Sequence, residues 1–140
     1  GNSGIFYHLK EGYNTPYEVA PEYQLLDDYG WEKINNATLE EWQKAGADYA
    51  MYSPNENNKI IKQAEEWNTT RIVFTPEKVE HWLNGKMILS FVPWSEDWYK
   101  RKSESKWKNA EKYGTFKKGY IGLQDHDSPL WFRNIKIRKL

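Results

Sequence analysis

The chain has 140 residues, no cysteine, and 20 basic against 20 acidic residues. This length suits a single domain with its own core, and a formal charge of zero argues against nucleic-acid binding, which usually needs a basic surface. Without cysteine there is no disulfide, thiolate metal site or cysteine nucleophile, and no apolar run is long enough to cross a bilayer.

The first third of the chain alternates expected strands with loops. Glycine, asparagine and proline over residues 11–21 predict a loop. A short helix is expected over residues 38–46, because Thr38 and Glu41 have the spacing of a capping box. The alternating patterns predict strands at residues 2–9, 22–28 and 48–52.

The strongest local signal is Asn84-Gly85, a dipeptide that favours a two-residue hairpin turn with positive φ at both positions. It joins expected strands at residues 79–83 and 86–92, and a strand at residues 67–74 precedes them. Together these three strands predict an antiparallel meander. The register of the hairpin would place His81 opposite Ile88.

Residues 95–110 break the strand rhythm. Ser95 is expected to cap a short helix whose first turn carries Glu96 and Asp97, the charge that a helix N-terminus favours. The lysine-rich stretch over residues 100–118 is interpreted as a solvated helix and loop. The alternative is a lid packed over the sandwich by its interleaved aromatic residues: Trp98, Trp107, Tyr113 and Phe116. The predicted fold class is therefore all-β: a jelly-roll β-sandwich in one domain with a short helical excursion.

The last segment, residues 119–140, is predicted to form two strands joined by a turn, with residues 131–138 as the second strand. Gln124 and His126 are two residues apart and would project side by side from one face of the sheet. An amide beside an imidazole suits polyol binding or proton transfer. His126 is therefore the first candidate for proton transfer, because its unperturbed pKa lies near neutrality.

Glu22 and Gln24 have the same spacing on an earlier expected strand, and we expect all four side chains to converge on one sheet face. Glu22 is the second catalytic candidate, with Gln24 and Gln124 as substrate-binding amides. The structural alternatives stay open: Glu22 as a surface carboxylate, Gln24 as a partner of backbone groups, and His126 as a cap of the turn at residues 127–129.

Three residues of the meander are further candidates for substrate binding. Arg71 has the chemistry to polarise a ketone oxygen or to form an ordinary salt bridge. His81 lies on an apolar face, where a structural histidine is the alternative, and Trp82 fits either a sugar platform or the core. No metal or other cofactor is expected, since the acidic turns lack the spacing of a calcium loop: Asp27, Asp28, Asp125 and Asp127.

Several motifs in order resemble one family across nearly the whole chain. They are NSGIF (2–6), PEYQLLDD (21–28), EWN (66–68), RIV (71–73), VEHWLNG (79–85), SKWK (105–108) and GYIGLQDHDSPLWFRNIKIRKL (119–140). This pattern resembles the 3-keto-disaccharide hydrolase domain family. The resemblance implies a concanavalin A-like fold, action on glycosides, and a bacterial, extracytoplasmic protein.

The same resemblance implies that several strands precede the NSGIF motif in other family members. We therefore expect an N-terminally truncated domain that associates with another chain or with the missing strands, because open sheet edges invite pairing. The function expected is cleavage of 3-keto-glycosides by removal of the proton beside the ketone. A non-catalytic carbohydrate-binding module is the alternative.

Overall fold

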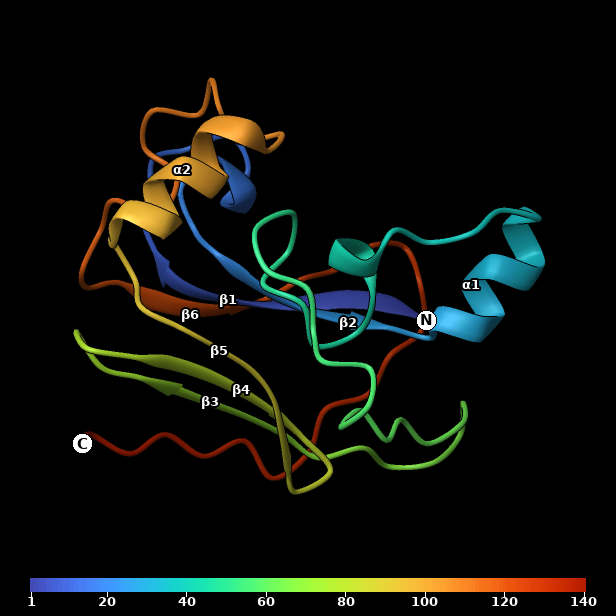
Figure 1. Ribbon diagram of the computed structural model, residues 1–140. Helices are drawn as coiled ribbons and strands as arrows, with labels where there is room; N and C mark the ends of the chain where they lie inside the picture. The colour runs from blue at the N-terminus through green and yellow to red at the C-terminus, as the bar shows by residue number, and fades with distance from the viewer.

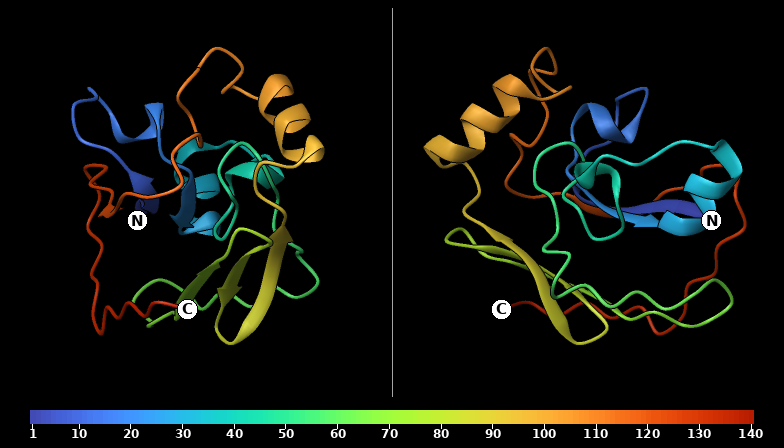
Figure 2. Two further views of the ribbon diagram at one scale, coloured as in Figure 1. Left: turned by 90° about the vertical axis from the view of Figure 1, so that its left-hand side faces the viewer. Right: turned by 45° about the vertical axis from the view of Figure 1, so that its right-hand side comes forward.

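The computed structural model describes residues 1–140 as two three-stranded antiparallel sheets, one above the other (Figures 1 and 2). The first sheet has the order β2–β1–β6, and the second sheet has the order β3–β4–β5. The strands are β1 (Asn2–Leu9), β2 (Glu22–Leu26), β3 (Thr70–Phe74), β4 (Val79–Leu83), β5 (Lys86–Phe91) and β6 (Tyr120–Leu123).

Helices are few and short. The α-helices are α1 (Asp28–Asn35) and α2 (Glu96–Glu104), and the 3-10 turns are η1 (Pro16–Glu18) and η2 (Glu41–Gln43). The predicted all-β class is confirmed, and so is the helix near residue 95, where Ser95 Oγ accepts from Trp98 N at 3.2 Å. None of these helices has the length and apolar character that a membrane crossing requires.

The side chain of Tyr23 on β2 links the two sheets. Its hydroxyl donates to the carbonyl oxygen of Trp82 at 3.1 Å, and its ring centroid lies 4.6 Å from that of His81. Because side chains alternate along a strand, Tyr23 pointing toward the second sheet turns Glu22 and Gln24 the opposite way. We call the face that carries Glu22 and Gln24 the outer face of the first sheet.

An aromatic core attaches α2 and the loop after it to the second sheet. The Trp107 and Tyr113 rings of this loop stack with centroids 4.5 Å apart. A buried side chain of this size contributes on the order of 2–3 kcal/mol of transfer free energy. Gly114 N donates to Val19 O at 2.8 Å, which ties the loop to the segment just before β2. The core comprises Met51, Tyr52, Val79, Leu89, Phe91, Trp98, Trp107 and Tyr113.

The predicted meander and its turn are confirmed. Asn84 has φ 47° and Gly85 has φ 81°, the positive values that the dipeptide predicts. The predicted pairing of His81 with Ile88 is wrong. A bulge shifts the register, so that His81 pairs with Leu89 while Ile88 is left without a partner in the ladder.

Two predictions in the first third of the chain are corrected. The strand expected to reach residue 28 ends at Leu26, because Asp27 accepts from Gly30 N at 3.0 Å and caps α1. The acidic pair that suggested a turn is in fact a helix start. The helix expected over residues 38–46 is only the turn η2, whose capping box is formed by Glu40 with Gln43.

Two expected strands are absent. Residues 48–52 form only single bridges, from Asp48 to Tyr23 and to Tyr52, because the chain turns back on itself there. The strand expected over residues 131–138 does not form: β6 pairs with β1 instead, and residues 124–140 carry no regular secondary structure. A positive φ of 56° at Asn134 interrupts the extended backbone that this strand would need.

Candidate active site

A hollow of about 160 Å³ opens on the outer face of the first sheet, beside β2. We call it the small hollow. The four side chains expected to converge all line it, so the predicted juxtaposition is present, while their roles stay predictions. Its lining residues are Asn2, Tyr17, Glu22, Gln24, Tyr49, Lys106, Trp107, Gln124 and His126.

Strand register brings the two glutamines together across β1. Gln24 pairs with Gly4, and Gln124 N donates to Gly4 O at 2.9 Å. Ser3 Oγ donates to Gln124 O at 2.7 Å, which fixes the chain just past the end of β6. A side chain at Gly4 would collide with the carboxyl group of Glu22. Glycine at this position therefore leaves the space that Glu22 occupies.

Glu22 is the strongest acid–base candidate of the site. Its residue is only 5% exposed, and this burial raises its pKa from 4.5 to about 8. The negative charge of Asp48 acts in the same direction, while the ammonium of Lys106 opposes both. Near neutral pH the carboxyl group therefore keeps its proton and is able to act as a general acid.

Lys106 is a site residue that the sequence reasoning missed. Its Nζ lies 4.4 Å from the ring centroid of Tyr49 and 4.5 Å from that of Trp107. Partial loss of water against these rings lowers the pKa of Lys106, and the charge of Glu22 acts the other way. The simpler interpretation of the lysine-rich stretch, a solvated loop, does not hold around Lys106, where the packed alternative applies. The tryptophan within the SKWK motif was the available signal that this part of it is packed.

Polar and aromatic side chains complete the small hollow. The Gln24 amide is buried: its Nε2 donates to Gln43 O at 3.1 Å, whereas its Oε1 has no hydrogen-bond partner. A buried acceptor without a partner favours a ligand that donates a hydroxyl proton. The Tyr17 ring, 45% exposed, supplies flat apolar surface, which suits the C–H face of a sugar. It packs against Trp107 with centroids 6.3 Å apart, and Trp107 itself is buried.

A second buried carboxyl group lies near Glu22. Asp48 is fully buried, and Tyr7 Oη donates to its Oδ1 at 3.0 Å. Asp48 Oδ2 and the hydroxyl of Tyr113 are buried without hydrogen-bond partners. Burial raises the pKa of Asp48 to about 7, and the hydrogen bond from Tyr7 counteracts this in part. No sequence pattern marks this residue, which belongs to the short strand predicted over residues 48–52.

His126 is exposed and lies in the loop that follows β6. The alternative role considered for it was that of a cap for the following turn. In the structure Asp125 performs a capping contact there: its Oδ1 accepts from Asp127 N at 3.2 Å, and Asp127 has φ 53°. His126 itself lines the small hollow.

Arg71, His81 and Trp82 do not line the small hollow. His81 lies fully buried between the sheets and donates from Nδ1 to Gly46 O at 2.9 Å, since a carbonyl oxygen only accepts. Burial lowers its pKa to about 4, so it stays neutral. The Arg71 guanidinium lies 4.1 Å from the centroid of the Trp82 ring. A substrate-binding role for these three residues stays a prediction.

The arrangement therefore combines a protonated carboxyl group, an imidazole, an ammonium group and three amides around one hollow. No three histidine, aspartate or glutamate side chains gather as the ligands of a metal ion would. Such a set can move protons at a polyol held by hydrogen bonds. Fold and site together define an all-β protein with a candidate acid–base site for a carbohydrate-like ligand.

Comparison with known proteins identifies the family. The model of the 3-keto-alpha-glucoside-1,2-lyase-like domain matches residues 1–138, and the chain belongs to this family. The chain is also 31% identical over 165 residues to a 3-keto-disaccharide hydrolase of Bacteroides thetaiotaomicron, a match that covers 100% of this chain and 54% of that protein. The resemblance found in the sequence motifs is thus confirmed.

Two crystal structures of candidate glycosyl hydrolases from Parabacteroides distasonis ATCC 8503 are similar to the chain. The first has a TM-score of 0.80 at 44% identity, covering 90% of this chain and 58% of that one. The second has a TM-score of 0.55 at 27% identity, covering 65% of this chain and 44% of that one. The chain therefore spans roughly half the length of these relatives.

Proposed function

We propose that the chain cleaves the glycosidic bond of 3-keto-glycosides by acid–base chemistry in the small hollow. The observation that supports this is a buried carboxyl group with a pKa of about 8, Glu22, lining the same hollow as an imidazole and an ammonium group. The name of the Bacteroides relative supplies the substrate class. An enzyme needs such opposed acid and base groups, whereas a binding module does not.

The chemistry follows from the ketone at C3 of the sugar, which acidifies the hydrogen on C2. His126 takes the C2 proton, and the electron pair left behind forms an enolate whose oxygen the Lys106 ammonium stabilises. The enolate then reforms the ketone and breaks the bond between C1 and the glycosidic oxygen. Glu22 gives its proton to that departing oxygen. The products are a 1,2-unsaturated keto-sugar and a free alcohol or sugar.

Addition of water across the new double bond would convert this product into the free 3-keto-sugar, so that elimination and hydration together amount to hydrolysis. The amides of Gln24 and Gln124 hold the sugar hydroxyls, and Tyr17 covers a ring face. Precise holding of the ring matters, because correct orientation alone contributes a large share of a rate enhancement.

The test is to incubate the chain with methyl 3-keto-α-glucoside and with unoxidised methyl α-glucoside, followed by proton NMR in deuterated water. We expect loss of the keto-glycoside alone, with deuterium entering at C2. Cleavage of the unoxidised glycoside at the same rate would refute the elimination mechanism. Binding of the keto-glycoside without any chemical change would favour the carbohydrate-binding module.

We also propose a specific architecture and an association for the chain. Two packed antiparallel sheets support a concanavalin A-like jelly roll. Association with another polypeptide, a second copy included, is supported by β6, an edge strand whose large apolar side chains are exposed: Tyr120 61%, Ile121 50% and Leu123 44%. Light scattering that showed only monomer at high concentration would exclude self-association. The extracytoplasmic location stays a prediction.

A further inference from the structure

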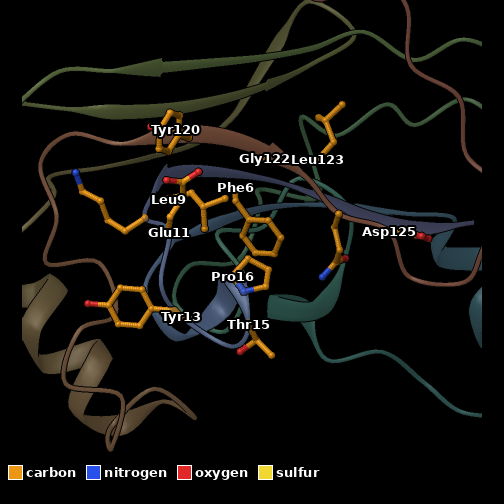
Figure 3. A pocket seen from close by; sticks show the side chains of 12 residues that line it. Phe6, Leu9, Glu11, Tyr13, Thr15, Pro16, Tyr120, Gly122, Leu123 and Asp125 are labelled. Atoms are coloured by element: carbon orange, nitrogen blue, oxygen red, sulfur yellow. The ribbon is translucent and has the colours of Figure 1, made fainter.

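A second and larger hollow, of about 500 Å³, lies on the first sheet beside β1 and β6 (Figure 3). We call it the large hollow. Figure 3 shows Phe6 and Pro16 near its middle and Tyr13 and Asp125 toward opposite ends. Its lining combines aromatic rings with polar and charged side chains: Phe6, Leu9, Lys10, Glu11, Tyr13, Thr15, Pro16, Tyr120, Gly122, Leu123, Gln124 and Asp125.

The two hollows adjoin each other on one sheet face. Gln124 lines both of them. Phe6, in the floor of the large hollow, pairs directly with Glu22 of the small hollow, and paired residues point to the same side of a sheet. The segment around η1 forms a shared wall, because Pro16 lines the large hollow and the next residue, Tyr17, lines the small one.

The sizes of the hollows differ in a way that bears on the substrate. Sites that enclose a drug-sized ligand usually measure roughly 300–1,000 Å³. The small hollow, at about 160 Å³, falls below that range, and the large hollow, at about 500 Å³, falls within it. A ligand of two sugar rings thus needs both hollows. The large one provides aromatic surface and hydrogen-bonding groups, the combination that a sugar ring requires.

We propose that the large hollow binds the second sugar of a disaccharide, the sugar that leaves, while the small hollow binds the keto-sugar. This inference rests on the proposed function and extends it to the substrate. Gln124, between the hollows, then lies beside the glycosidic bond. Tyr13 is the natural platform for the leaving sugar: it is 37% exposed, and its ring rests edge-on against Phe116 with centroids 6.1 Å apart.

The kinetic test compares two substrates that differ only in the leaving group: the 3-keto form of maltose and methyl 3-keto-α-glucoside. Tyr13→Ala should lower kcat/KM for the disaccharide by about tenfold, the scale of one lost aromatic contact, and leave the methyl glycoside unchanged. Tyr99→Ala is the matched control. Tyr99 is also exposed, at 54%, and also rests edge-on against a neighbour, Trp98, but it lies on α2 outside both hollows.

An equal loss on both substrates, or no loss on the disaccharide, would overturn the inference. A binding test covers the case in which neither substrate is cleaved. The ¹⁵N-labelled chain is titrated with maltose and with methyl α-glucoside, and amide shifts are mapped. We expect maltose to shift both Tyr13 and Tyr17, and the methyl glycoside to shift Tyr17 alone.

The two tests separate the two proposals. Maltose shifts in both hollows without any cleavage of keto-glycosides would refute the proposed function and support the two-sugar inference. Cleavage of keto-glycosides with maltose shifts confined to the small hollow would support the proposed function and refute the two-sugar inference.

Discussion

The two sheets have the same number of strands but differ in where their strands come from and in their buried polar residues. The first sheet brings together strands from both ends of the chain, and four buried polar residues belong to it or lie beside it: Ser3, Glu22, Gln24 and Asp48. Glu22 and Gln24 are on its outer face. The second sheet is one continuous meander. Its buried polar residues are Glu80, which accepts from the Trp82 indole at 2.9 Å, and His81, which is sealed between the sheets.

For a buried polar group, access to a ligand matters as much as burial. His81 is more deeply buried than Glu22 and lines neither hollow, whereas Glu22 borders the small one. Burying a polar group costs stability. Where a hollow leaves such a group within reach of a ligand, its shifted pKa is useful for catalysis. We therefore expect the first sheet to carry the function and the second to support it, a division that four experiments would test.

The largest expected effect is on turnover. Glu22→Gln and His126→Ala should each lower kcat/KM for a 3-keto-glycoside by about 10²- to 10⁴-fold, the usual contribution of an acid or a base. The matched control is Glu80→Gln, which changes a buried glutamate of the second sheet and should retain full turnover. Activity that survives in His126→Ala, or a loss in Glu80→Gln as large as in Glu22→Gln, would erase the distinction between the sheets.

The next effect is on stability as a function of pH. Burial raises the folded-state pKa of Glu22 to about 8 and that of Asp48 to about 7. Each group therefore favours the folded state below its ordinary pKa, of 4.5 and 3.8, and this stability is lost as pH rises through the folded values. Between about pH 5 and 8 we expect the free energy of unfolding to fall by a few kcal/mol.

Glu22→Gln should remove part of that fall, as measured by urea unfolding at the two pH values. Glu80 contributes to the pH dependence of stability with the opposite sign. Hydrogen bonds from Lys78 and then from Trp82 lower the pKa of Glu80, so its contribution is present above its ordinary pKa and is lost only on acidification. The alkaline fall should therefore persist in Glu80→Gln. A wild-type stability that does not change over this interval would contradict the buried, protonated state of Glu22.

A third experiment probes the packing beneath the site. Gly4→Ala puts a methyl group where the Glu22 carboxyl lies, and it should cost about 1–3 kcal/mol of unfolding free energy. In a Glu22→Ala background the same substitution should cost much less, because the collision is gone. Thermal or urea unfolding of the four chains gives the coupling energy. Strictly additive costs would mean that Gly4 does not make room for Glu22.

The second sheet could be predicted almost completely from the sequence, because its signals are local. Asn84-Gly85 fixes a turn between neighbouring strands. The bulge beside His81 escaped, since nothing in the alternation marks it, and β3 begins at Thr70 rather than at residue 67. The first sheet depends on the pairing of β1 with β6, over a hundred residues away. No short-range pattern encodes such a pairing, which explains why β6 was assigned to a hairpin with residues 131–138.

The residues of the candidate site also fall into two groups, those that local sequence spacing predicts and those that it does not. Glu22 with Gln24, and Gln124 with His126, could be paired from sequence because a spacing of two residues fixes a common face on an extended chain. Lys106, Tyr49 and Asp48 come from loops and single bridges, where no period relates position to direction. The Trp107 indole donates to Tyr49 O at 3.0 Å and so holds the neighbouring Lys106 at the site, a long-range contact that no sequence period marks.

The smallest expected effect concerns Arg71 on the second sheet. Its guanidinium lies 4.1 Å from the centroid of the Trp82 ring, directly across the strand pair, and both residues are outside the two hollows. We expect Arg71→Gln to lower the free energy of unfolding by about 0.5–1 kcal/mol, as for an exposed cation–π contact. Arg138→Gln, an exposed arginine in the irregular C-terminal segment, should cause no change.

Turnover is the sharper readout for Arg71. If the second sheet only supports the site, Arg71→Gln retains the wild-type kcat/KM for 3-keto-glycosides, and a double-mutant cycle with Trp82→Leu accounts for its whole stability effect. A fall in kcat/KM without further loss of stability would instead return Arg71 to the substrate-binding role that its chemistry suggested. The functional face would then have to extend across both sheets, because a residue on β3 would be contacting the substrate.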